Sequence, residues 1–509
     1  MGLNLLSFYQ NKVKKEWKIA FFSAFIACLL IHIYKFTNTL PNHDSPFNVY
    51  VDQNMTASGR WFLQYACGIS SYFDLPWLNG FLSAAYLGIV SVCIVGVFGI
   101  SNPVVIVLSA ILLSACPCTT ETFFFEFTAD GYFLGFAFSA AAAWLSCRGT
   151  RFVHYMLSAV LLCLSCAIYQ AYISFAMVLC VCYMVNSMLE NTMTVKDAWK
   201  WIRTHVIIYA VAMLVYFVLW KTIMLVSNIQ PNSYQGIDSV GKLSFHTLLN
   251  GAVKSISNLL IFFLEWNIFE HPITLYAILN IVFIICFVAV VVVAVVKSGI
   301  YKNGPSMVLV MIGLIVCVPM ISIWNFVSET ITYRSMMLHS VIVMYIFAII
   351  LFDRWVHPKW STVFGFFMAI MMFNNAIIAN ISYFYLEKCA QKSMLMGMQI
   401  VERINEEDEF EAIAFVGNRI QEASLSGVFP AQKIQYLTNV LETDLLYEHS
   451  IAYKYLSTTF DFKIAKLPDY QLKILKEHPM VSQMGVWPAE DSVQVIDGVL
   501  VIKLAEATE

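Results

Sequence analysis

The sequence predicts an α-helical polytopic membrane protein with about 11 transmembrane helices and a small C-terminal α+β extracytoplasmic domain. Three observations carry this prediction. The 509 residues are 59% hydrophobic and 12% charged, whereas about 25% of the residues of a soluble domain are charged. The apolar residues form runs long enough to cross a hydrocarbon core about 30 Å thick. The charge is uneven, because residues 383–509 carry a net −8 and the preceding residues carry +5.

The apolar runs predict spans at 19–37, 79–99, 103–118, 131–147, 153–167, 169–187, 204–225, 273–296, 306–324, 335–352 and 360–382. One long broken helix at 153–187 is the alternative to two spans there. Basic residues decide between these readings. With a cytoplasmic N-terminus, the N-terminal lysines and the basic loops near residues 150, 200, 300 and 357 all face the cytoplasm, as the positive-inside rule expects. We expect the first span not to be a cleavable signal, since no small-residue cleavage site follows it.

We expect a membrane domain at 1–385 and a soluble domain at 386–509. The soluble domain contains a helical pattern, an apolar strand with a turn, two further helical patterns and a closing hairpin with Asp-Gly at its tip. These are at Leu386–Asn405, Glu411–Arg419, Gln432–Leu446, Tyr470–Glu477 and Asp497-Gly498. The domain has no glycine-rich phosphate loop and no nucleotide fingerprint, which argues against a nucleotide-consuming enzyme.

Polar residues concentrate in the predicted outer loops 38–77, 117–130, 227–271 and 325–334. The middle of the third loop, 244–263, has helical apolar spacing and is expected to lie along the membrane surface. A catalytic or binding site is therefore expected to face outward.

The first outer loop offers carboxylates and an arginine. Asp44, beside His43, and Asp52 can act as a general base if they stay ionised near an acceptor hydroxyl. Turn formation and helix capping are the alternative roles for these residues. In Ser58-Gly-Arg-Trp, the guanidinium of Arg60 can hold a phosphate through forked donors, or it can anchor the chain at lipid headgroups.

The other outer segments add acidic, aromatic and amide groups. Glu121, Glu126 and Asp130 alternate with phenylalanines, a combination that suits sugar rings but is also typical of an aromatic belt at the membrane interface. Glu329 and Arg334 can form a local salt bridge that caps the following span. Gln170, near a predicted break between spans, can join neighbouring helices.

Cysteine and histidine indicate no metal site in this sequence. Most of the 13 cysteines lie in apolar runs, where cysteine is a small hydrophobe, and no CxxC pair stands near a second pair or a histidine cluster. His154, His205, His339 and His357 are scattered without ligand spacing. We therefore expect neither a zinc site nor a disulfide framework.

Taken together, the motifs resemble the phage-type O-antigen glucosyltransferases that bring about serotype conversion. The resemblance rests on a carboxylate after the first span, SGRWF at Ser58–Phe62, the acidic-aromatic loop ending in Asp130, and three further motifs. These are YQ at Tyr169-Gln170, TYR at Thr332–Arg334 and the C-terminal VIDGVLVIK hairpin. The resemblance implies a membrane glycosyltransferase of the GT-C architecture, in the bacterial inner membrane with its C-terminal domain in the periplasm.

The family's chemistry implies that a hexose, usually glucose, moves from undecaprenyl phosphate to a surface glycan such as the O-antigen of lipopolysaccharide. Asp44 is the best match to the family's catalytic base, and Asp52 is the second. Arg60 or Arg334 would hold the donor phosphate, and one displacement would invert the anomeric configuration. The sugar or acceptor would contact Trp61, Glu121, Glu126, Asp130, Gln170, Glu329 and Tyr333. Mg²⁺ or Mn²⁺ is compatible with the phosphate site but not required, and no nucleic acid is expected.

Three other classes share some of these features. A glycolipid flippase would also have many spans and polar rims, but transporters show internal repeats, which this sequence lacks. A membrane acyltransferase needs a catalytic histidine within a span, for which His339 is the one candidate. A non-catalytic receptor would leave the loop carboxylates unexplained.

Overall fold

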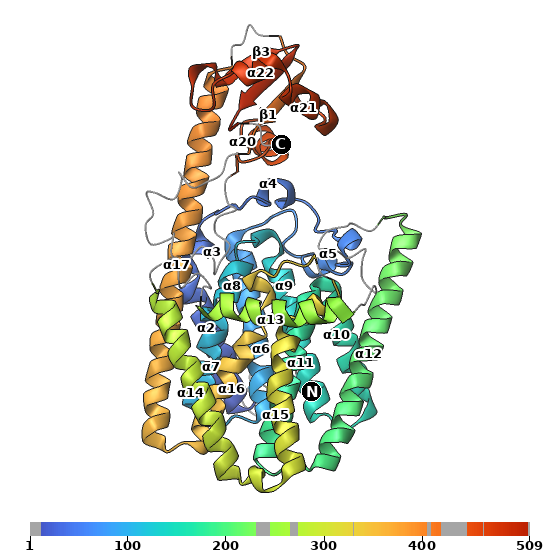
Figure 1. Ribbon diagram of the computed structural model, residues 1–509, viewed down its shortest axis with the longest axis vertical. Helices are drawn as coiled ribbons and strands as arrows, with labels where there is room; N and C mark the ends of the chain where they lie inside the picture. Colours follow the sequence, from blue (N-terminus) through green and yellow to red (C-terminus); the bar gives the residue numbers. More distant parts are fainter. Residues whose placement is uncertain are drawn as a thin grey trace, which may run out of the picture. The chain divides into compact units, whose positions relative to one another are not determined.

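The structure is a computed structural model that describes residues 12–230, 245–264, 273–328, 330–404, 409–418, 445–461 and 463–506 (Figure 1). The chain divides into two compact units. Within the described residues, the first unit holds 12–37 and 52–380, and the second holds 38–51 and 381–506. The outer loop predicted at 38–77 is thus shared between them, since its first part, with Asp44, belongs to the second unit.

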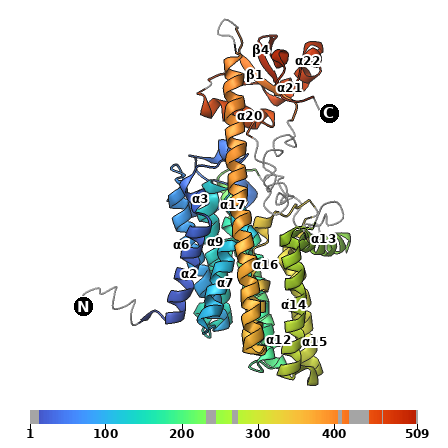
Figure 2. The same cartoon turned by 90° about the vertical axis from the view of Figure 1, so that its left-hand side faces the viewer.

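The first unit is helical. Its longer helices are α2 (Lys15–Ile31), α6 (Pro76–Phe98), α7 (Pro103–Ala115), α9 (Glu126–Arg148), α10 (Phe152–Ile168), α11 (Ile173–Leu189), α12 (Val195–Val226), α13 (Phe245–Leu264), α14 (Leu275–Ser298), α15 (Gly304–Ile321), α16 (Val341–Trp355) and the start of α17 (Pro358–Glu402). Short elements are α3 (Ile33–Thr37), α5 (Leu63–Ala66), α8 (Pro117–Thr122), η1 (Thr56–Ser58), η2 (Gln170–Tyr172), η4 (Ile300–Lys302), η5 (Ile323–Phe326) and η6 (Ser335–Met337). Figure 2 shows α2, α6, α7 and α9 packed side by side.

Among the described residues, seven helices are long and apolar enough to cross a membrane. Helices can cross the hydrocarbon core of a lipid bilayer because all their backbone hydrogen bonds are made within the helix itself. The prediction of a polytopic helical membrane protein is therefore confirmed. Each of the eleven predicted ranges contains a helix, while the number of crossings and their orientation stay predictions.

Local sequence sets where these helices begin and end. Gly99 and Gly299 close α6 and α14 with φ of 64° and 71°, a left-handed conformation that costs glycine little. Asn102 then accepts a hydrogen bond from the amide of Val104 at the start of α7, and Pro103 occupies the first helical position. Tight turns of this kind connect consecutive helices with few residues.

The chain reverses direction at Tyr169, between α10 and α11. Helix α10 runs antiparallel to α9, since Ser165 and Ser158 donate to the carbonyls of Gly135 and Ala142. Helix α11 runs parallel to α9, because contacts further along α9 are made further along α11. Ser139 donates to the carbonyl of Tyr172, and the hydroxyl of Ser146 lies 3.8 Å from the sulfur of Cys180. The stretch 153–187 is thus two opposed helices, as expected, and not one broken helix.

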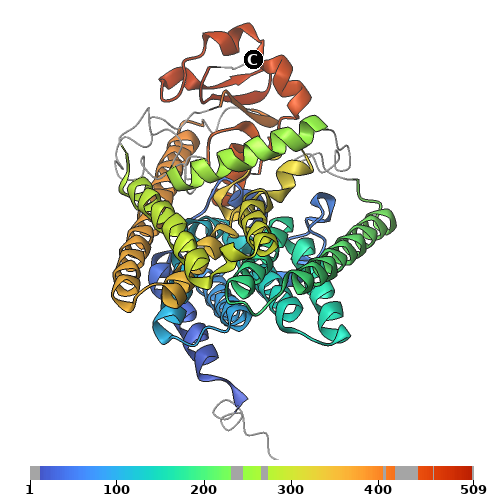
Figure 3. The same ribbon diagram turned by 60° about the horizontal axis from the view of Figure 1, so that its bottom comes forward.

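Helix α13 runs crosswise to α14 and α15 (Figures 1 and 3). Its buried side contacts η5 closely, since a Cβ on Gly251 would lie 2.9 Å from the carbonyl oxygen of Asn325. The opposite side exposes Leu248, Val253 and Ile256. The helix predicted at 244–263 is thus present. Its position along the membrane surface stays a prediction, since α13 is also one of the seven helices long and apolar enough to cross a membrane.

Basic residues gather at one end of the first unit. Arg148 donates to the carbonyl of Val97, and Arg354 donates to the carbonyl of Phe98 and pairs with Glu190. These residues come from loops that the sequence assigns to the cytoplasmic side. We call this end the basic end, and the opposite end, with loop 52–75 and η5, the polar end.

The second unit contains a four-stranded sheet of order β2-β1-β4-β3. The strands are β1 (Ala412–Val416), β2 (Ala465–Lys466), β3 (Val493–Ile496) and β4 (Val499–Lys503), and its helices are α4 (Ser45–Asn48), α20 (His449–Thr459), α21 (Asp469–Lys476), α22 (Pro479–Gln483) and the end of α17, with η10 (Glu490–Ser492) before β3. Strand β1 pairs in parallel with β2 and β4, and β3 pairs antiparallel with β4. Asp497 and Gly498 both have positive φ at the hairpin turn, as predicted.

Alternation along β1 builds two hydrophobic layers. Ile413 and Phe415 face α17 and α20, whereas Ala414 and Val416 face α21 and α22. Helix α4 packs against α20 within this unit. The helices predicted at 386–405 and 470–477 and the strand at 411–419 are confirmed, while most of the helix predicted at 432–446 lies outside the described residues.

Candidate functional site

The SGRW segment forms a tight turn at the polar end of the first unit. Gly59 has φ of 82° and follows η1, and an antiparallel bridge joins Met55 to Arg60. Helix α12 holds this turn through two side chains. The Tyr216 hydroxyl donates to the carbonyl of Gly59 over 3.0 Å, and the Trp220 indole donates to the carbonyl of Thr56 over 2.8 Å. A Cβ at Gly59 would lie 2.5 Å from the Tyr216 oxygen, so this position requires glycine.

Arg60 lies half-buried among tyrosines. Its Nη1 donates to the Tyr132 hydroxyl over 3.1 Å, and its guanidinium carbon lies 5.0 Å from the centroid of the Tyr169 ring. The Tyr132 and Tyr169 rings stack with centroids 4.7 Å apart. Stacking and hydrogen bonding orient the guanidinium plane, and an oriented guanidinium can bind a phosphate through two parallel bonds.

The three motifs SGRW, YQ and TYR meet in one hydrogen-bonded network. The amide of Gln170 donates to the carbonyl of Ser58 over 2.9 Å. The Trp324 indole donates to the carbonyl of Gln170 over 3.0 Å, and the Trp324 backbone amide donates to the Tyr333 hydroxyl over 3.1 Å. Arg334 is half-buried at the start of η6, and Glu329 lies outside the described residues. Segments more than 100 residues apart thus form one site, which we call the motif network.

Trp61 lies beside this network rather than within it. Its side chain is buried in a hydrophobic cluster with residues of α10 and α12, among them Cys166 and Trp220. Its contacts in this structure are therefore packing contacts, and its predicted role in sugar binding stays a prediction.

All three carboxylates of the second outer loop are buried in the first unit. Glu121 is fully buried and accepts a hydrogen bond from the backbone amide of Met336. Glu126 forms an ion pair of 2.7 Å with Lys35, and both side chains are buried. Asp130 is 1% exposed. Carboxylates this deep are costly, so they mark a site or an internal pair.

Sequence reasoning missed three partners of these residues. Lys35 falls near the end of the predicted span 19–37, and an ionisable residue within an apolar run is itself a signal of a buried partner. Tyr132 and Tyr216, which contact Arg60 and Gly59, lie in ordinary apolar patterns. Nothing in those patterns distinguishes them from core aromatics.

The two candidate bases lie in different units. Asp44 stands at the N-cap position of α4 but makes no capping bond, so the capping role considered for it is absent here. Its carboxylate is 45% exposed and lies 3.5 Å from Nε2 of His43. Asp52 is exposed in the first unit. The assignment of either carboxylate as the base stays a prediction.

The second unit carries a groove of about 920 Å³ beside the edge of its sheet. Glu411, Gln471, His478 and Asp497 line it together with apolar residues such as Ile474. Acceptors, donors and apolar surface are thus combined in a concave site of the size that binds small ligands.

The comparisons with known proteins give one match. A family model described as "Glucosyl transferase GtrII" matches residues 33–352, which is more than half of the chain and contains the whole motif network. No curated protein and no solved structure matches the chain significantly.

Proposed function

The chain belongs to the GtrII glucosyl transferase family, and from this premise we propose the reaction. The protein moves a hexose, glucose in the first place, from an undecaprenyl-phosphate carrier to a surface glycan such as the O-antigen of lipopolysaccharide. The motif network is the observation that carries this proposal. Family membership establishes a glucosyl transferase, while the polyprenyl donor, the acceptor and the mechanism are parts of the proposal.

Arg60 is the proposed phosphate ligand. A lipid-linked donor approaches from the bilayer, so its phosphate needs a cation at the membrane rim while its chain stays in hydrocarbon. The Tyr132 hydroxyl and the Tyr169 ring support this role because they orient the guanidinium at the polar end. Arg334 is the second proposed cation. Both would neutralise the charge that develops on the departing phosphate.

A carboxylate of the first outer loop is the proposed base, with Asp44 first and Asp52 second. The base takes the proton of the acceptor hydroxyl, whose oxygen attacks the anomeric carbon. The bond from that carbon to the phosphate oxygen breaks, and its electrons leave with the phosphate. One such displacement inverts the anomeric configuration. The exposure of Asp44 supports this role, because its carboxylate is accessible to a large acceptor.

We propose that the protein lies in the bacterial inner membrane with a cytoplasmic N-terminus and a periplasmic second unit. The gathering of Arg148 and Arg354 at the basic end supports this orientation. The polar end, with Arg60 and the buried carboxylates, then faces the periplasm, where the growing glycan is found.

An in vitro transfer assay tests the proposal. Purified full-length protein would receive polyprenyl-phosphate-[¹⁴C]glucose and O-antigen polysaccharide, with Asp44→Asn and Asp52→Asn in parallel. We expect glucose incorporation that is lost in Asp44→Asn, and none from a nucleotide-linked glucose alone. Full activity of Asp44→Asn with loss in Asp52→Asn would move the base to Asp52. No incorporation, together with donor movement across proteoliposomes, would instead identify a flippase.

A further inference from the structure

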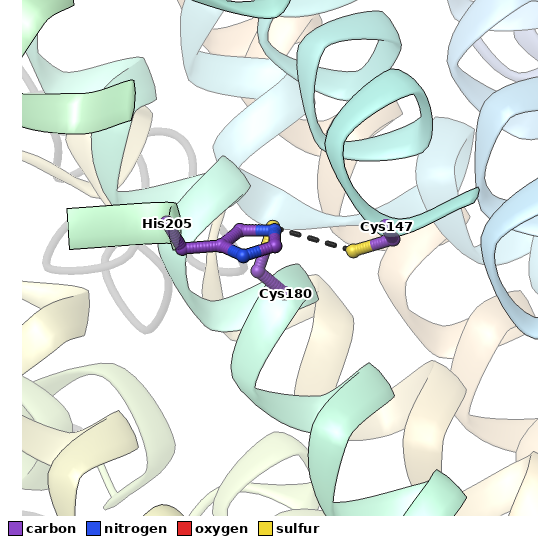
Figure 4. A group of neighbouring side chains, drawn as sticks. All are labelled: Cys147, Cys180 and His205. Atoms are coloured by element: carbon purple, nitrogen blue, oxygen red, sulfur yellow. Dashed lines mark hydrogen bonds between the residues drawn. The ribbon is translucent and has the colours of Figure 1, made fainter. Parts of the chain in front are cut away.

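Three soft metal-ligand side chains meet inside the first unit, away from the motif network. Cys147 at the end of α9, Cys180 on α11 and His205 on α12 place one ligand atom each within 4.8 Å of one another (Figure 4). The residues are 9%, 2% and 6% exposed, respectively. The sequence alone indicates no zinc site here, because these three residues are far apart along the chain and show no ligand spacing.

The histidine is held in the tautomer that a metal requires. Its Nδ1 lies 3.0 Å from the carbonyl oxygen of Trp201, which can only accept, so Nδ1 carries the proton. Nε2 therefore keeps the lone pair that a metal can use, and the ligand atom of His205 lies within 4.8 Å of both sulfur atoms. The Trp201 ring stacks on the imidazole at 3.6 Å and fixes its plane. Metal-binding histidines characteristically donate their second nitrogen to a carbonyl in this way.

The sulfur atoms also have the spacing of a shared ligand pair. Sγ of Cys147 and Sγ of Cys180 are 3.5 Å apart. Two thiolates on one tetrahedral Zn²⁺, each bonded at 2.3 Å, would be about 3.8 Å apart. Hydroxyls of Ser146 and Tyr209 lie 3.8 Å from the Cys180 sulfur, and such donors stabilise a thiolate.

We propose that Cys147, Cys180 and His205 bind one Zn²⁺ ion, with a solvent molecule as fourth ligand. Charge favours zinc over the other soft cation, Cu⁺. Two thiolates and a neutral imidazole give no net charge with a divalent ion, whereas with a monovalent ion the ligand set keeps a net negative charge at a buried site. The site adjoins Arg148 at the basic end, and we propose that this end of the protein faces the cytoplasm. The cytoplasm is reducing, so the two cysteines would stay as thiols that can bind a metal.

The position of the ion suggests a structural role. The three helices that it would join also carry, or directly follow, residues that contact the SGRW turn. Helix α9 carries Tyr132, the residues before α11 include Gln170, and α12 carries Tyr216. A zinc ion would thus fix the mutual positions of the helices that orient Arg60, without contact with substrate.

Metal analysis of the full-length protein tests this inference independently of its activity. The protein would be purified in detergent with a tag that contains no histidine, and its metals measured by mass spectrometry. We expect about one zinc per chain, reduced to background in Cys180→Ser and in His205→Asn. Cys182→Ser is the matched control, because this buried thiol two residues along α11 faces Cys317 instead, and it should keep the zinc.

A second measurement covers the case in which the ligand variants do not fold. Wild-type protein exchanged into Co²⁺ should show thiolate-to-cobalt charge transfer in the near ultraviolet and the visible bands of a tetrahedral site. The inference is wrong if the wild type has neither zinc nor these bands. It is also wrong if both ligand variants retain zinc, or if mass spectrometry finds Cys147 and Cys180 joined in a disulfide.

Discussion

The buried ion pair between Lys35 and Glu126 yields a quantitative prediction. Its Nζ–Oε2 distance is 2.7 Å, and the side chains are 2% and 4% exposed, so both charges are removed from bulk water. Removing one partner of such a pair leaves an uncompensated charge and costs about 3–5 kcal/mol, whereas replacing both by apolar residues is roughly neutral. We expect Lys35→Met and Glu126→Leu each to lower the free energy of unfolding by about 3–5 kcal/mol, and the double variant by less than either.

Equilibrium unfolding by SDS in mixed micelles measures these differences. Every cysteine except Cys286 is buried, so thiol labelling in a Cys286→Ser background reports unfolding with a low baseline. Glu190→Gln is the matched control. Its pair with Arg354 at the basic end is only partly buried, and such pairs contribute about 0–1 kcal/mol. Losses below about 1 kcal/mol in both Lys35→Met and Glu126→Leu would refute the reasoning, because they would mean that water reaches the pair.

The same double variant distinguishes a structural role of Glu126 from a role in sugar binding. If Glu126 orients the sugar or the acceptor, as we predict from the sequence, the double variant should be stable but inactive in the transfer assay. Full transfer by a stable double variant would show that Glu126 serves only to compensate Lys35.

Three further predictions concern other parts of the molecule. Gly59→Ala should reduce sugar transfer severely, because φ of 82° costs an L-residue about 1–2 kcal/mol and the new Cβ would lie 2.5 Å from the Tyr216 oxygen. Gly365→Ala is the control. Its Cβ would meet no atom closer than 3.6 Å, so this variant should transfer sugar normally. Arg60→Lys should raise KM for the donor by about tenfold with a smaller change in kcat, since lysine keeps the charge but loses the forked donors; an unchanged KM would favour Arg334 as the phosphate ligand. His449 is buried, accepts from the amide of Phe415 and lies 2.8 Å from the carbonyl of Leu467, and its burial lowers the pKa of its imidazole below 6.5. The unfolded chain then takes up the proton first, so amide-exchange protection of β1 should be constant above about pH 6.5 and fall below it. His449→Gln should remove this pH dependence.

Much of the architecture could be predicted because it depends on local sequence. An apolar run of about 20 residues in lipid must make all its backbone hydrogen bonds within itself, so the helices could be predicted from hydropathy alone. The approximate limits of α6 and α7 followed from the apolar runs 79–99 and 103–118, while the caps at Gly99 and Asn102 were recognised only in the structure. The hairpin at Asp497-Gly498 could be predicted because a two-residue hairpin turn requires positive φ at both residues, and Asp-Gly adopts this conformation readily. The short motifs that identified the family were local as well.

The sequence by itself therefore determined the helices, the C-terminal hairpin and the family. Only the tertiary structure decided which side chains face one another. Lys35 meets Glu126 across 91 residues, Gln170 meets Ser58 across 112, and Cys180 lies beside both Cys147 and His205. It also assigned Asp44 to the second unit. Such pairings depend on how each helix is rotated and which neighbours it packs against. Helices such as α6 and α9 are apolar on nearly every side, so their periodicity carries almost no record of that rotation, and the contacts had to come from the fold.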